Sequence, residues 1–135
     1  MKSLVVEDDF VCRKTLSSML QGFGDCDIAS DGVEAVEAVQ LALNEKTPYD
    51  LICLDIQMPN LDGHGTLTQV RGLERDAGIP VGRGAKIIMT TAMNDKENIF
   101  SAFRGNADAY LTKPIVLERL RGELLNLGLL KSVNE

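Results

Sequence analysis

Residues 4–9 of the chain read LVVEDD, three apolar residues followed by three acids. Residues 51–55 read LICLD, and this second apolar run also ends in an acid, Asp55. Short apolar runs are typical of strands that are covered on both faces in a parallel sheet. Because open α/β sheets bind ligands at the carboxyl ends of their strands, the acids that end these runs predict a binding site there.

Two further apolar runs end in polar residues of other kinds. Residues 87–91 read IIMTT, and residues 109–114 read AYLTKP. If all four runs are parallel strands of one sheet, their ends bring together several acids, a threonine hydroxyl and a lysine. Acids that lie close together repel one another unless positive charge lies between them. The pattern therefore predicts a divalent cation, and it leaves one acid available for chemistry.

The length and composition bound the class of protein. The 135 residues fit one domain of ordinary size, so we expect a single domain over residues 1–135. The net charge of -6 argues against a protein that follows nucleic-acid phosphates, because such a protein needs a basic face. No apolar stretch approaches the roughly 18 residues of a membrane span, and the N-terminus has no signal-peptide profile.

The cysteines agree with a reducing compartment. Cys12, Cys26 and Cys53 are odd in number and lack the spacing of a metal site. We interpret them as free thiols, buried or partly buried, in a cytoplasmic protein.

Strand-like and helix-like stretches alternate along the chain. The expected strands are residues 3–6, 25–29, 50–54, 86–90 and 109–112. The expected helices are residues 10–22, 31–43, 65–76, 95–104 and 115–130. Short parallel strands joined by helical crossovers predict a doubly wound, three-layer α/β domain with five β/α units.

Two local signals refine this assignment. Ser30 precedes the second expected helix and is a candidate N-cap. Residues 77–85 contain three glycines and a proline, which predicts a mobile surface loop before the fourth strand.

Asp55 is the candidate for covalent chemistry. An aspartate that ends a buried strand is held rigidly, and beside a cation its ionised carboxylate can attack phosphorus. The alternative is an aspartate that only caps a helix or shapes a turn. Glu7 and Asp8 offer the oxygen ligands that Mg²⁺ prefers. Thr91 and Lys113 offer a hydroxyl and an ammonium group that can neutralise a phosphoryl group.

Tyr110 and His64 are weaker candidates. Tyr110 lies on the last expected strand, where it can serve packing or rotate between buried and exposed positions. His64 is the only histidine and follows an Asp-Gly turn, so we expect it at the surface rather than in a metal site or catalysis.

Together these residues resemble the receiver domain of two-component response regulators. The resemblance extends from about residue 2 to residue 128 and is closest over residues 4–10 and 54–63. It is carried by Glu7-Asp8, Asp55 followed by MPNLDG at residues 58–63, Thr91-Ala92 and Lys113-Pro114. Each motif is weak alone, but all four at the expected strand ends are specific.

The resemblance implies a sheet order of 2-1-3-4-5 and a role for each site residue. Asp55 would be the phosphoacceptor, Thr91 and Lys113 would contact the phosphoryl group, and Thr91 and Tyr110 would act as the switch. Mg²⁺ would be bound by Asp8, by Asp55 and by the backbone carbonyl of Gln57, with Glu7 acting through water. The output surface would be the fourth helix, fifth strand and fifth helix, roughly residues 94–128.

The resemblance also implies partners. A histidine kinase or phosphotransfer protein would supply the phosphoryl group, and a downstream protein would bind the phosphorylated form. The chain would be a signalling module, not an enzyme with a separate substrate, and a monomer or a phosphorylation-dependent dimer. We expect a stand-alone receiver rather than a fragment of a larger signalling protein.

Two other classes share parts of the pattern. A small Mg²⁺-dependent phosphatase of the haloacid dehalogenase type also uses an aspartyl nucleophile after a strand. It normally has a second acid two residues later, where this chain has Gln57. A flavodoxin-like flavin carrier needs a Ser/Thr-rich phosphate loop after the first strand, where this chain has acids at 7–9.

Overall fold

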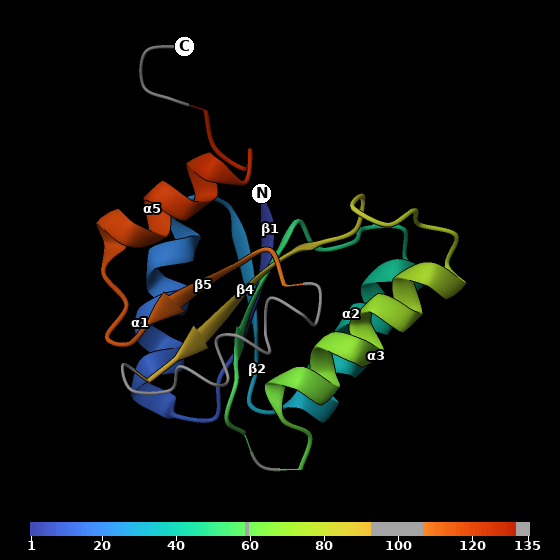
Figure 1. Ribbon diagram of the computed structural model, residues 1–135, viewed down its shortest axis with the longest axis horizontal. Helices are drawn as coiled ribbons and strands as arrows, with labels where there is room; N and C mark the ends of the chain where they lie inside the picture. The colour runs from blue at the N-terminus through green and yellow to red at the C-terminus, as the bar shows by residue number, and fades with distance from the viewer. Residues whose placement is uncertain (59, 93–106, 132–135) are drawn as a thin grey trace.

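The computed structural model describes residues 1–58, 60–92 and 107–131, and it contains one five-stranded parallel sheet (Figure 1). The strand order is β2-β1-β3-β4-β5, which confirms the predicted doubly wound topology. The strands are β1 (Lys2–Val6), β2 (Asp25–Ala29), β3 (Leu51–Asp55), β4 (Lys86–Thr91) and β5 (Ala109–Thr112).

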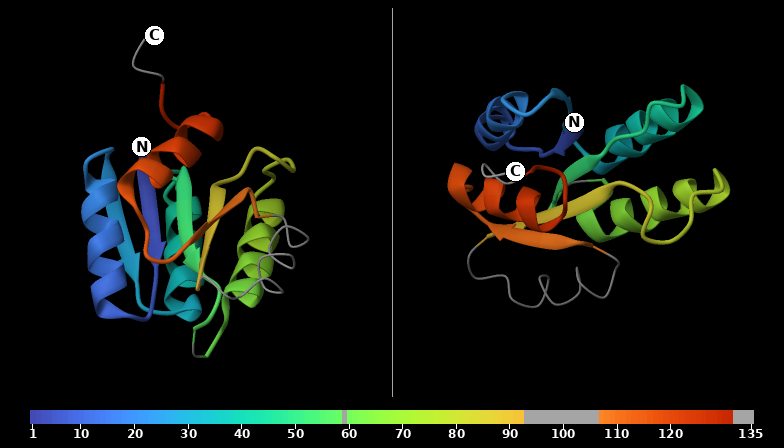
Figure 2. Two further views of the ribbon diagram at one scale, coloured as in Figure 1. Left: turned by 60° about the vertical axis from the view of Figure 1, so that its left-hand side comes forward. Right: turned by 90° about the horizontal axis from the view of Figure 1, so that it is seen from above.

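Helices cover both faces of the sheet, as Figure 2 shows from above. They are α1 (Phe10–Gln21), α2 (Gly32–Asn44), α3 (Gly63–Asp76) and α5 (Leu117–Asn126). α1 and α5 lie on one face, and α2 and α3 lie on the other. The helix expected over residues 95–104 lies outside the described residues.

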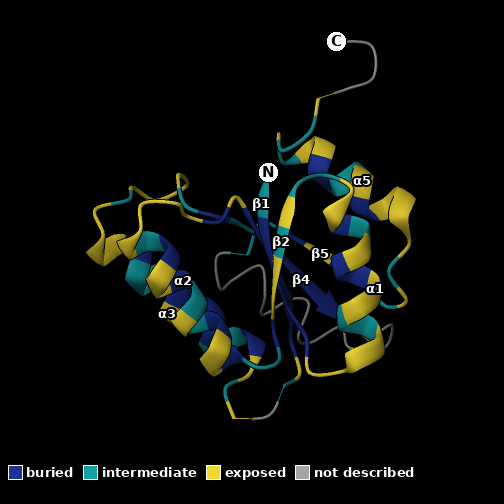
Figure 3. Ribbon diagram, turned by 180° about the vertical axis from the view of Figure 1, so that it is seen from behind, coloured by how far each residue is buried: buried dark blue, intermediate teal, exposed yellow. Residues whose placement is uncertain are grey.

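The hydrophobic core forms two layers because successive side chains of a strand point to opposite faces. In β1, Leu4 and Val6 pack toward α2 and α3, whereas Val5 packs toward α1 and α5. β3 is buried along its whole length. β2 is the exception, because it is an edge strand and most of its residues are exposed (Figure 3).

Aspartates begin three of the helices. Asp9, Asp31 and Asp62 each accept a hydrogen bond from a backbone N–H in the first turn of α1, α2 and α3. The prediction that Ser30 caps the second helix is therefore wrong by one residue. Ser30 instead donates from its N–H and hydroxyl to the carboxylate of Glu34, so it supports the cap from outside the helix.

α5 is shorter than its sequence pattern predicts. Val116 has an extended backbone, so the helix begins at Leu117 rather than at residue 115. It ends at Asn126, and Gly128 adopts a left-handed conformation with φ of 77°. The apolar periodicity continues to Leu130 because Leu127, Leu129 and Leu130 still pack on the core after the helix has ended.

A buried polar network fixes the end of the loop at residues 77–85. The Glu74 carboxylate accepts hydrogen bonds from the Ala85 N–H at 2.7 Å and from Arg71 at 2.6 Å. Arg71 also donates to the Ala85 carbonyl and to Asp108, and Asp108 accepts from the Ile87 N–H at 2.8 Å. The network therefore joins α3 to the amino ends of β4 and β5.

This network predicts a specific loss of stability. Glu74→Ala leaves the buried Ala85 N–H and one side of Arg71 without their partner, which costs about 2–4 kcal/mol in the free energy of unfolding. Urea denaturation measures this change. The matched control is Glu37→Ala on the exposed side of α2, which we expect to change stability by less than about 0.5 kcal/mol. Equal losses in the two variants would contradict the structural role of Glu74.

Candidate functional site

Three acids meet at the carboxyl edge of the sheet. Glu7 and Asp8 follow β1, and Asp55 is the last residue of β3. The parallel register pairs Val6 with Leu54, so the residues that follow them emerge side by side. One oxygen from each of the three carboxylates lies within 4.8 Å of the others. The structure thus brings together the acids that the sequence predicted to be neighbours.

Lys113 enters this cluster from the end of β5. Its Nζ atom lies 2.8 Å from Glu7 Oε2 and 3.4 Å from Asp55 Oδ1. Its backbone N–H donates to the Thr91 carbonyl at 2.7 Å, which holds the end of β5 against the end of β4. Burial lowers the pKa of Lys113, but its hydrogen bond to Glu7 and the neighbouring carboxylates outweigh burial and raise it. The lysine is therefore protonated and carries its positive charge beside the carboxylates of Glu7 and Asp55.

The carboxyl group of Asp55 has a strongly raised pKa. Its relative exposure is 4%, and its Oδ1 accepts a hydrogen bond from the Gln57 N–H at 3.3 Å. Burial, and then the charge of Glu7, raise the pKa of Asp55 to about 7, although Lys113 opposes the shift. One ammonium group does not compensate two buried carboxylates and a third beside them, so a further cation would stabilise the ionised form.

The donor set fits Mg²⁺. This ion prefers oxygen ligands, such as carboxylates, a backbone carbonyl and several water molecules. Asp8 is exposed, so a metal ion bound to this carboxylate could also keep water molecules as ligands. Glu7 is nearly fully buried, and its two oxygens already accept from the Asp9 N–H and from Lys113. That arrangement favours Asp8 and Asp55 over Glu7 as direct ligands.

Thr91 lies at the end of β4 beside this cluster. β4 pairs Thr90 with Asp55, and Thr91 follows it and is buried. The Thr91 hydroxyl donates to the Ala92 carbonyl at 3.3 Å. A donor at this position can turn toward a group attached to Asp55 only by giving up that bond.

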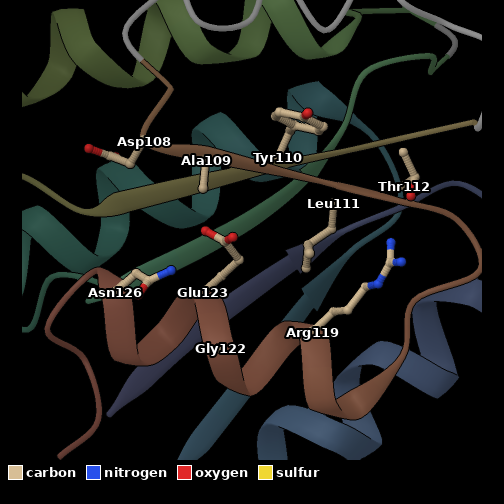
Figure 4. Close-up of a pocket in the computed structure, with 9 residues that line it drawn as sticks. All are labelled: Asp108, Ala109, Tyr110, Leu111, Thr112, Arg119, Gly122, Glu123 and Asn126. Carbon is tan, nitrogen blue, oxygen red and sulfur yellow. The ribbon is translucent and has the colours of Figure 1, made fainter.

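Tyr110 lies away from the acids, on β5. Figure 4 shows its ring on the opposite side of β5 from Leu111, which points toward α5. The tyrosine is 38% exposed and borders a groove of about 500 Å³ between β5 and α5. Arg119 and Glu123 line this groove from α5. Of the predicted output surface at residues 94–128, the structure describes residues 107–128.

His64 is not a plain surface residue. It is half-buried, and its Nε2 atom is inaccessible and has no hydrogen-bond partner among the described residues. The preceding residue approaches β3 closely, because a Cβ atom on Gly63 would lie only 2.5 Å from the Asp55 carbonyl. This contact draws the first turn of α3 against the end of β3.

Arg13 supports the site but carries no role in the sequence-based interpretation. Its guanidinium group donates to the Glu7 carbonyl at 2.9 Å. An arginine one turn into a helix that follows an acidic loop can reach back to that loop, and this spacing is the only local signal for its role.

Comparison with known proteins assigns the family. The family model for the response regulator receiver domain matches residues 3–125 of the sequence. The chain is 34% identical to the regulatory protein VanRB of Enterococcus faecalis over 131 residues, which covers 94% of this chain and 53% of that protein. It is 32% identical to the osmosensing histidine protein kinase SLN1 of Saccharomyces cerevisiae over 122 residues, 89% of this chain and 9% of that protein. The chain thus spans about half or less of these relatives.

Solved structures agree with this assignment. The chemotaxis protein CheY4 of Vibrio cholerae superposes with a TM-score of 0.76 at 27% identity, over 93% of this chain and 97% of that one. The receiver domain of the histidine kinase CKI1 from Arabidopsis thaliana gives a TM-score of 0.81 at 24% identity, over 96% and 89% of the two chains, and supports the fold alone. With its five-stranded sheet and its acid cluster, the chain belongs to the response regulator receiver domain family.

Proposed function

We propose that the chain receives a phosphoryl group on Asp55 from a histidine kinase or a phosphotransfer protein. The observation that carries this proposal is the charge imbalance around Asp55, a buried carboxylate with a raised pKa whose one cationic partner among the described residues is Lys113. Receiver domains are signalling modules that bind Mg²⁺ at an acidic pocket, and the cluster of Glu7, Asp8 and Asp55 is compatible with such a site.

The transfer moves one phosphoryl group between two side chains. A carboxylate oxygen of Asp55 attacks the phosphorus of a phosphohistidine, the N–P bond breaks, and its electron pair returns to the imidazole nitrogen. The product is an acyl phosphate on Asp55, which water later hydrolyses. Lys113 pairs with the phosphoryl oxygens, and the Thr91 hydroxyl donates to them.

The acid cluster also supports a proposal for a metal site. We assign Asp8, Asp55 and the backbone carbonyl of Gln57 as the Mg²⁺ ligands, with Glu7 acting through water. Bound Mg²⁺ supplies the positive charge that offsets the phosphoryl oxygens and the clustered acids. Both oxygens of Glu7 are already engaged, which supports its indirect role.

Phosphorylation then changes the output surface. Each contact of Lys113 and Thr91 with the phosphoryl group replaces one seen in the structure, to Glu7, to Asp55 or to the Ala92 carbonyl. A new set of charge-assisted bonds favours a second arrangement of the ends of β4 and β5. Tyr110 and the groove between β5 and α5 report that change to a partner protein.

We further propose that residues 1–135 form one receiver domain, with a core at about 2–128, and that this domain acts in the cytoplasm. All three cysteines are free thiols, as expected for a reducing compartment. Among the described residues, no helix is long and apolar enough to cross a membrane. In this role the chain is a monomer, or a dimer that forms on phosphorylation.

Acetyl phosphate tests the phosphoacceptor. Incubation with Mg²⁺ should give one phosphoryl adduct on the wild type by intact mass spectrometry and none on Asp55→Asn, because the amide is not a nucleophile. Omitting Mg²⁺ should abolish the adduct. Asp50→Asn is the matched control, because Asp50 precedes the same strand at its opposite end and should leave the adduct unchanged. An adduct that persists in Asp55→Asn would reject Asp55 as the acceptor.

The raised pKa of Asp55 predicts a pH-dependent stability difference. The unfolded carboxyl titrates near 3.8 and the folded one near 7, so ionisation destabilises the folded protein as the pH rises through that window. Without divalent cations, Asp55→Asn should therefore be more stable than the wild type by about 1–3 kcal/mol at about pH 8, with a smaller gain at about pH 5. Urea denaturation at both pH values measures this gain.

Magnesium provides the control for that experiment. Because Mg²⁺ binds the ionised wild-type site, saturating Mg²⁺ should stabilise the wild type more than Asp55→Asn and reduce the difference. A stability difference that is independent of pH would show that the charge of Asp55 is not what destabilises the folded protein.

A further inference from the structure

We propose that the N-terminus of α2 positions the loop that follows the phosphoacceptor, with Asp31 as the positioning residue. This inference rests on the proposed function of Asp55. The described part of the loop comprises residues 56–58 and 60–62, and it includes Gln57, whose carbonyl we assigned to the metal. Asp31 belongs to a different β/α unit and is 24 positions earlier in the chain than Asp55.

Asp31 makes two hydrogen bonds with its two carboxylate oxygens. Oδ1 accepts from the Glu34 N–H at 2.9 Å and caps α2. Oδ2 accepts from the Asn60 side-chain amide at 3.2 Å. Hydrogen bonds from Glu34 and Asn60 lower the pKa of Asp31, so the carboxylate stays ionised and both bonds are charge-assisted. The second bond is not needed for the cap, and it holds the loop.

Asn60 is suited to be held in this way. Its φ of 68° lies in the left-handed region, which asparagine tolerates better than most residues. The bond to Asp31 fixes the side chain of the residue that makes this turn. A backbone hydrogen bond closes the loop, because the Gly63 N–H donates to the Ile56 carbonyl at 2.9 Å.

Gly32 provides a second, independent contact between the N-terminus of α2 and the loop that follows Asp55. A Cβ atom at this position would overlap the Thr66 hydroxyl and lie 2.5 Å from the Leu61 carbonyl oxygen. The start of α2 therefore lies directly against both the loop and the first turn of α3. The absence of a side chain at Gly32 is what permits Asp31 to reach Asn60.

The consequence for the site is preorganisation. Gln57 already donates its N–H to Asp55, so displacement of the loop changes both the orientation of that carboxylate and the position of the Gln57 carbonyl. A site whose ligands are held before binding loses less conformational entropy when the ion arrives. Asp31 thus acts on metal binding through Asn60 and without touching the metal.

Two variants separate this role from helix capping. Asp31→Ser retains a good N-cap side chain but is too short to hold Asn60 as well. Asn60→Gly keeps the left-handed backbone and removes the amide. The matched control is Glu34→Gln, which removes one negative charge from the same helix terminus but leaves the bond between Asp31 and Asn60 intact.

The first measurement is amide hydrogen exchange of the metal-free protein. We expect faster exchange at residues 57, 58 and 60–62 in Asp31→Ser and Asn60→Gly, and wild-type exchange there in Glu34→Gln. The second is Mg²⁺ affinity by NMR titration, because the chain has no tryptophan to report binding. We expect both single variants to bind Mg²⁺ about threefold to tenfold more weakly, the scale of one ordinary intramolecular hydrogen bond, because the bond between Asn60 and Asp31 is exposed to solvent.

The double variant decides whether Asp31 acts through Asn60. If it does, Asp31→Ser with Asn60→Gly weakens binding no more than one single variant, whereas independent effects multiply. Multiplying effects, or wild-type loop exchange in both single variants, would overturn the proposal. If Asp31→Ser also lowers the midpoint of thermal unfolding, the loop exchange and the Mg²⁺ affinity of Asn60→Gly alone are compared with those of the wild type. If the wild type neither binds Mg²⁺ nor forms the adduct, the proposed function fails, while the exchange data still decide the positioning role.

Discussion

The contact of Lys113 with Glu7 and Asp55 is the constraint on which the rest of the site depends. Two carboxylates are buried at the ends of β1 and β3, and one ammonium group from the end of β5 lies between them. A buried charge is costly unless it is paired, and here the pairing is incomplete. The sheet forces these groups together, so the folded protein holds an excess of negative charge that a bound cation can relieve.

The topology explains why this excess of negative charge arises where it does. β1 and β3 are neighbours at the centre of the sheet, although a whole β/α unit separates them in the chain. Their buried cores make the acid cluster rigid, because close-packed strands allow little movement of their ends. β5 is an edge strand with an exposed tyrosine and an open groove beside it. The fold thus combines a buried acid cluster at the centre of the sheet with an exposed tyrosine and a groove at its β5 edge.

The strand ends could be predicted from the sequence because their signal is local. An apolar run that stops at polar or charged residues specifies both a buried strand and the residues at its carboxyl end, and Glu7, Asp55 and Lys113 follow from that rule. The N-cap of α2 could not, since Ser30 and Asp31 are both good caps and only Asp31 also bonds to Asn60. The roles of Arg13 and of the network around Glu74 could not be predicted either, because their partners lie in other elements and leave no periodic pattern.

A comparison of the two edges of the sheet separates structural acids from functional ones. At the amino edge, the carboxylates of Glu74 and Asp108 share Arg71 and also accept bonds from backbone N–H groups of β4 and the residue before it. Their hydrogen-bonding demand is met within the protein, so they stabilise the fold. At the carboxyl edge, Glu7 and Asp55 also accept one backbone N–H each, but at the longer distances of 3.2 and 3.3 Å. Asp8 adds a third carboxylate to the two that share Lys113, and burial and the charge of Glu7 raise the pKa of Asp55. Longer hydrogen bonds and an excess of negative charge therefore distinguish the carboxyl edge from the amino edge.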